Sequence, residues 1–283
     1  MQWNELFWVI YMDKTAEYYD SNRTDEKVMG YLDKQYQKGK GHEAEAIAGV
    51  SSFHLRGRVA TVSLAASVDI GHELKILDVG SGPGGTARYL SETFSSQVIG
   101  LDLTYAFSRL AKKLSEKSGL PDSTRFVCAN ALDIPFGNEK FDMVWLEHVQ
   151  MNIRNKTRLV AELYRVLKPG GTLAIYEVFQ VGSRPPEYPL PWADTPEVSF
   201  LIAPGKMKQL LETTGFNCLK WHDCLDEIRA WIETRRIKES ASDNLLTGVE
   251  LLMGDRADEK VKNLTDAVMD KRLTVIEGVL KKL

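Results

Sequence analysis

Two acidic residues accompany a glycine-rich turn in the first third of the chain. Residues 80–85 read GSGPGG, Asp78 lies two residues before the first glycine, and Asp102 ends the next apolar run. Glycine has no Cβ, so the backbone of such a turn can bend sharply and a ligand can approach it closely. A carboxylate in the position of Asp102 can accept the hydroxyl hydrogens of a ribose. The spacing therefore predicts a site for a cofactor that carries a nucleoside.

The spacing GxGxxG also fits a dinucleotide-binding turn, and alone it is weak evidence for either cofactor. Asp78 argues against a dinucleotide, because its carboxylate would repel a bound pyrophosphate. A cofactor with a cationic amino-acid tail tolerates that charge better. An NAD-dependent oxidoreductase and a cofactor-binding module without catalytic activity remain alternatives, as does a purely structural turn.

Alternating short apolar runs and amphipathic segments surround this turn. Strands are expected at residues 75–79, 97–102, 125–129, 141–147, 172–178 and 272–280. Helices are expected between them, with Leu159, Val160 and Leu163 on the inner stripe of a helix at 155–167, and a turn at the KPGG of 168–171. Such alternation predicts an α/β fold with a mostly parallel sheet covered on both faces. The carboxyl ends of its strands would hold the ligand.

Composition narrows the class of partner. The chain has 283 residues, 43% of them hydrophobic, and a formal net charge of −3, which argues against a nucleic-acid surface. Its three cysteines form no CxxC pair, so we expect neither a disulfide framework nor a metal site. No apolar segment is long enough to span a bilayer. We expect a cytoplasmic monomer or homodimer without a membrane partner.

Five ordered motifs carry a family resemblance: ILDVGSGPGG, VIGLDLT, NALDIPF, FDMVWLEHV and RVLKPGGTLAI. They resemble the successive motifs of Rossmann-like S-adenosylmethionine-dependent methyltransferases. The resemblance implies a doubly wound, mostly parallel, seven-stranded sheet. It also implies a helical N-terminal cap at 1–70 and a cofactor-binding domain at 71–283, with a lid at 182–204 and a helical insertion at 224–270 before the last strand.

The resemblance also implies which residues contact S-adenosylmethionine. The glycine turn would hold the methionine part, the acid after the second strand the ribose, and the third motif the adenine. The implied contacts are Asp78, Gly80, Ser81, Gly82, Asp102, Leu103, Asn130, Ala131, Leu132 and Glu147. A tyrosine of AEYYDS, either Tyr18 or Tyr19, would approach the methionine end, and we assign that contact to Tyr19.

Residues after the fourth strand are candidates for contact with the methyl acceptor. Glu147 and His148 lie at its carboxyl end, and both are candidate catalytic residues. His148 would orient the acceptor or take its proton; alternatively, it only bonds the next loop. Trp192 lies in a proline-rich stretch and would close over the site, because an aromatic face attracts a methylated ammonium. Its alternative role is to anchor that loop.

Three further stretches, FHLRGRVAT, PLPWADTPEVSFL and RLTVIEGVLKKL, are similar to the sarcosine/dimethylglycine N-methyltransferase branch. This similarity implies a small-molecule methyl acceptor, namely an amine such as sarcosine or dimethylglycine. O- or C-methylation of a small metabolite or natural product is the alternative, followed by the NAD-dependent oxidoreductase.

Overall fold

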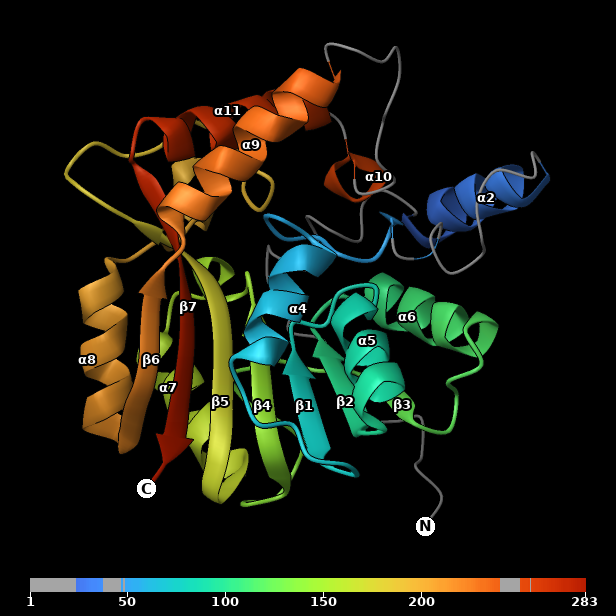
Figure 1. Cartoon of the computed structure of the whole chain (residues 1–283), viewed down its shortest axis with the longest axis vertical. Helices are drawn as coiled ribbons and strands as arrows, with labels where there is room; N and C mark the ends of the chain where they lie inside the picture. The colour runs from blue at the N-terminus through green and yellow to red at the C-terminus, as the bar shows by residue number, and fades with distance from the viewer. Residues whose placement is uncertain (1–23, 38–46, 48, 240–249, 255) are drawn as a thin grey trace.

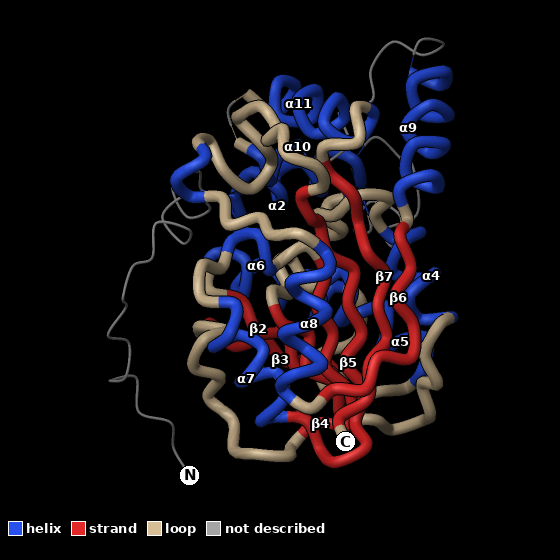
Figure 2. Tube along the Cα trace, turned by 90° about the vertical axis from the view of Figure 1, so that its left-hand side faces the viewer, coloured by secondary structure: helices blue, strands red, loops and turns tan. Residues whose placement is uncertain are grey.

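The computed structural model describes residues 24–37, 47, 49–239, 250–254 and 256–283. A seven-stranded sheet forms its centre, and helices cover both of its faces (Figures 1 and 2). The predicted cofactor contact of Tyr19 lies outside the described residues.

The strands follow the order β3-β2-β1-β4-β5-β7-β6. β1 to β5 pair in parallel, and β7 lies antiparallel between β5 and β6. The strands are β1 (Lys75–Val79), β2 (Gln97–Asp102), β3 (Thr124–Cys128), β4 (Phe141–Glu147), β5 (Leu167–Gln180), β6 (Phe216–Asp223) and β7 (Leu273–Lys282). The predicted seven-stranded, mostly parallel sheet is confirmed. Strand order reverses between β1 and β4, where such a sheet opens a crevice for ligands.

Both faces of the sheet are covered because its central strands are apolar on both sides. Ile76 and Leu77 are neighbours in β1, so they point to opposite faces, and both are fully buried. The helices are α4 (Arg58–Ala66), α5 (Gly85–Phe94), α6 (Tyr105–Lys117), α7 (Lys156–Val166) and α8 (Pro204–Thr214). Residues of α4 and α5 pack with Ile76, and residues of α7 and α8 pack with Leu77.

A further group of helices lies beyond the strand ends, above the sheet in Figure 1. It comprises α2 (Thr24–Gln37), α9 (Leu225–Glu239), α10 (Glu250–Met253) and α11 (Ala257–Met269). α9 to α11 connect β6 to β7, and Ile228 of α9 and Val268 of α11 belong to the core that contains Trp145. Among the described helices, none combines the length and the apolar character that crossing a membrane requires.

The predicted turn at residues 168–171 lies inside β5. Phe141 pairs with Leu167, but Met143 pairs with Thr172, so β5 has extra residues between these two pairs. Gly170 has a φ of 72°, a conformation that glycine adopts without a steric penalty. The KPGG sequence therefore makes an irregularity within one strand instead of a turn between two elements.

A hydrogen-bond network around the buried Glu277 fixes α4 against the sheet. Glu277 of β7 is 1% exposed and receives hydrogen bonds from Ser63 (3.0 Å), Ser67 (2.7 Å) and the Lys220 ammonium (2.5 Å). Burial alone would raise the pKa of Glu277, but the bonds from Lys220 and the two serines outweigh it and lower the pKa. The network ties α4 to β6 and β7, and Thr61 of α4 bonds to Glu147 in the site described below.

Close packing beneath the glycine turn requires Gly100 in β2. A Cβ at this position would lie 2.5 Å from Cδ1 of Phe126 and 2.7 Å from the hydroxyl oxygen of Ser81. Neither contact is sterically allowed, so the absence of a side chain at Gly100 lets β3 and the turn approach β2.

Gly100→Ala is expected to lower the free energy of unfolding by about 1–3 kcal/mol, because the added methyl overpacks the core. Gly205→Ala is the matched control, since a Cβ at Gly205 in α8 meets no atom within 4 Å. Urea denaturation of both variants measures the effect. Equal unfolding free energies for Gly100→Ala and the wild type would contradict this account of the packing.

Candidate functional site

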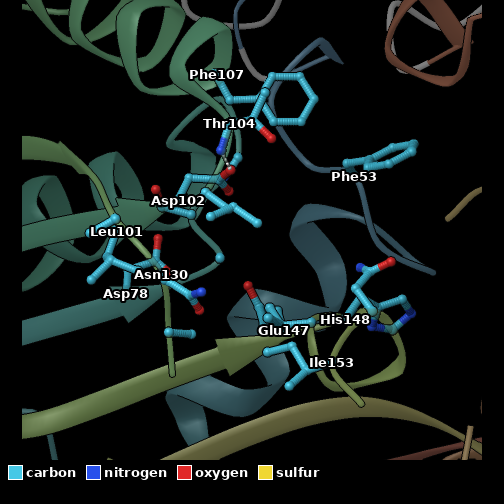
Figure 3. A pocket seen from close by; sticks show the side chains of 18 of the residues that line it. Phe53, Asp78, Leu101, Asp102, Thr104, Phe107, Asn130, Glu147, His148 and Ile153 are labelled. Atoms are coloured by element: carbon cyan, nitrogen blue, oxygen red, sulfur yellow. Dashed lines mark hydrogen bonds between the residues drawn. The ribbon is translucent and has the colours of Figure 1, made fainter. Parts of the chain in front are cut away.

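A cavity of about 570 Å³ opens where strand order reverses, at the carboxyl ends of β1, β2 and β4. Figure 3 shows Asp102 on one side of it and Glu147 and His148 on another. The cavity is lined by the predicted residues Asp78, Gly80, Ser81, Gly82, Asp102, Leu103, Asn130, Ala131, Leu132, Glu147 and His148. The fold therefore gathers residues from four separated motifs around one space.

The glycine turn is a backbone surface that side chains would block. Gly80 has a φ of 72°, and a Cβ there would lie 2.3 Å from Cγ2 of Val149. Gly82 has a φ of 50°, and a Cβ there would meet nothing within 4 Å. The Gly80 N–H donates to the carbonyl of Leu101 at 2.7 Å, which fixes the turn against β2. The turn is held on one side and open to the cavity on the other.

Asp102 is held in place by the backbone around it. One carboxylate oxygen accepts the Gly82 N–H at 2.8 Å, and the other accepts the Thr104 N–H at 2.9 Å. Two backbone N–H groups therefore fix the orientation of this carboxylate at the cavity wall. Asp102 is therefore a preorganised acceptor at the end of β2.

Asp78 is a buried acid with an unpaired oxygen. It is 2% exposed, and its Oδ2 has no hydrogen-bond partner among the described residues. Burial raises the pKa of Asp78 well above its ordinary range, and the nearby Glu147 and Asp102 raise it further. A cationic group of a ligand would remove this penalty by pairing with the carboxylate.

Glu147 is held by two threonine hydroxyls that sequence reasoning missed. Its Oε2 accepts hydrogen bonds from Thr86 (2.5 Å) and from Thr61 (3.3 Å), the latter on α4. Its Oε1 is buried and has no hydrogen-bond partner among the described residues; Nε2 of His54 lies 3.8 Å away. Glu147 therefore presents one unpaired oxygen at the end of β4.

The charges in the cavity select the kind of ligand that fits. Asp78, Asp102 and Glu147 all line the same space, and two of them have an unpaired buried oxygen. A pyrophosphate would add negative charge beside these acids, whereas a ligand with an ammonium group would neutralise it. The cavity therefore fits a cationic cofactor and argues against NAD.

His148 bridges two backbone segments. Its Nε2 accepts the Leu55 N–H at 3.3 Å, and its Nδ1 lies 3.0 Å from the carbonyl oxygen of Tyr176, to which it donates. Burial lowers the pKa of His148 to about 3, with a further contribution from the nearby His54. Both ring nitrogens are occupied and the ring is a weak base. The geometry therefore favours the alternative role, in which His148 only bonds neighbouring loops, over catalysis.

The buried side chains of Glu177 and Lys156 hold the loop after His148 through hydrogen bonds to its backbone. The Glu177 carboxylate accepts the N–H groups of Val149 (2.9 Å) and Gln150 (3.2 Å). The Lys156 ammonium donates to the carbonyls of Gln150 and Ile153. Burial raises the pKa of Glu177 to about 8 and lowers that of Lys156 to about 8. These two buried groups shape one wall of the cavity without lining it.

Residues 130–132, the predicted adenine contacts, lie in a compact turn. Asn130 accepts the Leu132 N–H through its amide oxygen at 2.8 Å, which sets the backbone of residues 130–132. Leu103 and Phe107, which follow β2 in the chain, also line the cavity. The amide oxygen of Asn130 keeps a second lone pair for a ligand.

Trp192 lies away from the cavity lining, in the core formed with α9 and α11. It is 4% exposed, and its indole N–H donates to Ser199 at 3.0 Å. The structure thus gives Trp192 the loop-anchoring role. The residues of that loop that border the cavity are Glu197, Val198 and Phe200, with Arg154 stacked 4.7 Å from the Phe200 ring centre. No sequence pattern distinguished them.

Comparison with known proteins agrees with this geometry. Residues 77–175 match the family described as a methyltransferase domain. This chain contains an S-adenosylmethionine-dependent methyltransferase domain. Over 101 residues it is 39% identical to the chloroplastic tocopherol O-methyltransferase of Arabidopsis thaliana, covering 36% of this chain and 29% of that protein. Over 160 residues it is 28% identical to the glycine/sarcosine/dimethylglycine N-methyltransferase of Actinopolyspora halophila, covering 56% and 28%.

A solved structure extends the likeness in fold. Phosphoethanolamine N-methyltransferase 2 of Haemonchus contortus, in complex with S-adenosyl-L-methionine, superposes with a TM-score of 0.65 at 19% identity, covering 95% of this chain and 60% of that one. The chain spans less than a third of the length of the two relatives named above. The methyltransferase domain's cofactor is S-adenosylmethionine, and the unpaired acid Asp78 fits the ammonium group of its methionine part.

The bridging geometry predicts that His148 stays neutral between about pH 5 and 8, the range in which an ordinary histidine titrates. Its lowered pKa of about 3 is the reason. Proton and carbon NMR of the His148 ring, assigned with His148→Gln, measures this directly. A titration midpoint inside that range would contradict the hydrogen-bond assignment.

Proposed function

We propose that this chain transfers a methyl group from S-adenosylmethionine to the nitrogen of a small amine, with sarcosine or dimethylglycine as representative acceptors. The observation that carries the proposal is the unpaired Oε1 of Glu147, buried in an acid-lined cavity beside the glycine turn. An amine presents N–H groups and positive charge, which such an oxygen binds. The bound cofactor supplies an electrophilic methyl group on a sulfonium.

The proposed cofactor contacts divide the cavity by chemistry. Asp78 pairs with the ammonium of the methionine part, and Gly80 and Gly82 let the backbone approach it. Asp102 accepts the ribose hydroxyls, and the turn at 130–132 borders the adenine. The fixed carboxylate of Asp102 and the unpaired Oδ2 of Asp78 support this division. Tyr19 remains the proposed contact at the methionine end.

Glu147 is then the acid left for the acceptor. Thr61 and Thr86 hold its Oε2, so the unpaired Oε1 has a fixed position from which to orient an acceptor N–H. Orientation of this kind contributes roughly 7–11 kcal/mol to reactions between two bound groups. Methyl transfer from a sulfonium is a displacement in line with the departing sulfur, so a protein that aligns the acceptor and excludes water does most of the work.

An amine acceptor is also supported by the name of one relative, the N-methyltransferase of Actinopolyspora halophila. The tocopherol O-methyltransferase makes a hydroxyl acceptor the second candidate. The net charge of −3 supports a small molecule over a nucleic acid in either case.

A methyl-transfer screen tests the proposal. The whole chain is incubated with S-adenosylmethionine and panels of small amines, phenols and carbon acids, and products are identified by mass. We expect one added methyl group on an amine. Methylated phenols or carbon acids with unmodified amines would contradict N-methylation and support the other acceptor classes.

Glu147→Gln tests, in the same assay, whether the unpaired Oε1 of Glu147 binds the amine. The amide keeps the shape of the side chain but removes its charge, so we expect a KM for the amine at least about 10-fold higher, the loss of one charged hydrogen bond. Asp133→Asn is the matched control, because its carboxylate is exposed and lies outside the cavity. An unchanged KM in Glu147→Gln would remove Glu147 from the acceptor site.

A further inference from the structure

We propose that His54 takes the proton from the amine acceptor, a role for which sequence reasoning selected His148. The inference rests on the proposed N-methyltransferase function and assigns its proton acceptor. His54 belongs to the segment before α4 and lines the same cavity as Glu147 and the glycine turn.

Hydrogen bonds fix which ring nitrogen of His54 carries the hydrogen. Nε2 lies 2.9 Å from the carbonyl oxygen of Gly57 and 3.1 Å from the hydroxyl oxygen of Thr61. A carbonyl oxygen only accepts, so Nε2 is the protonated nitrogen of the neutral ring. The Thr61 hydroxyl in turn donates to Glu147. The chain of donors therefore runs from His54 through Thr61 to Glu147.

This tautomer leaves a lone pair on Nδ1. Within the described residues Nδ1 makes no hydrogen bond, although the His54 side chain is only 6% exposed. His148 differs, because backbone groups occupy both of its nitrogens. Of the two histidines that line the cavity, His54 is the one whose basic nitrogen has no hydrogen-bond partner among the described residues.

Three side chains lie around the His54 ring. From β4, Glu147 Oε1 lies 3.8 Å from Nε2. From the loop after β4 and from β5, the rings of His148 and Tyr176 lie with their centres at 5.9 and 6.1 Å. Glu147 is thus a charged group whose carboxylate faces the ring. His54 and Glu147 lie side by side and line the same cavity.

The proton transfer balances with the methyl transfer. An amine that enters as an ammonium gives one proton to Nδ1 of His54, which becomes an imidazolium. The freed nitrogen lone pair forms the new N–C bond, and the C–S bond breaks with its electron pair on sulfur. The products are the methylated ammonium and a neutral thioether, and the imidazolium returns its proton to solvent as the products leave.

His54→Gln separates the basic nitrogen from the structural one. The glutamine amide NH2 replaces the Nε2–H donor toward Gly57 and Thr61, but the side chain has no basic nitrogen. We expect kcat for the amine to fall about 10²- to 10⁴-fold near neutral pH, the usual contribution of a general base. We also expect the remaining rate to rise with pH as solvent deprotonates the amine, with unchanged affinity for S-adenosylmethionine. His222→Gln, on an exposed histidine of β6, is the matched control.

Two results from the kinetics and stability of His54→Gln would overturn the inference while leaving the proposed function intact. One is a His54→Gln variant that has the same kcat and pH profile as an active wild type. The other is a variant that loses cofactor affinity and thermal stability together with kcat, which would mark a structural role. Nitrogen NMR gives a readout without turnover, because Nδ1 of His54 should show the shift of an unprotonated nitrogen; a proton on Nδ1 would also overturn it. A wild type that methylates no amine contradicts the proposed function itself.

Discussion

The structure depends on buried acidic side chains whose oxygens the described part of the protein leaves partly unpaired. Asp78 and Glu147 each have a buried oxygen without a hydrogen-bond partner among the described residues, and Asp102 lines the same cavity. Unpaired buried acids are costly, so they shift toward the protonated form or require a cation. A zwitterionic sulfonium cofactor meets that requirement with its ammonium group. The same requirement argues against a cofactor built on a pyrophosphate.

The fold concentrates these acids by placing strand ends next to one another. Asp78 lies near the end of β1, Asp102 ends β2 and Glu147 ends β4, and these are neighbouring parallel strands. Close approach beneath the site depends on glycine, since Gly80 and Gly100 have no room for a Cβ. The absence of side chains at these two glycines therefore lets backbone segments lie close together beneath the cavity.

Sequence reasoning predicted the sheet, and the described residues that it assigned to the cofactor line one cavity, because local motifs determine both. It left two roles open for His148 and for Trp192, because their surroundings come from distant segments. The role of His148 depends on the Leu55 N–H, 93 residues away in the chain, and on a carbonyl of β5. His54 was overlooked for the same reason, because its partner Glu147 is just as remote. Trp192 has its nearest polar partner within its own loop, but only the packing of α9 and α11 shows that its ring is in the core.

Isothermal titration calorimetry of S-adenosylmethionine binding, in mildly acidic buffers of different ionisation enthalpy, tests the central claim. The pKa of Asp78 is raised in the free protein, and a bound ammonium favours its ionised form. At a pH below that raised pKa, the wild type should release more protons on binding than Asp78→Asn, and its affinity should rise with pH. Equal proton release and equal affinity in the two proteins would contradict the pairing of Asp78 with the cofactor.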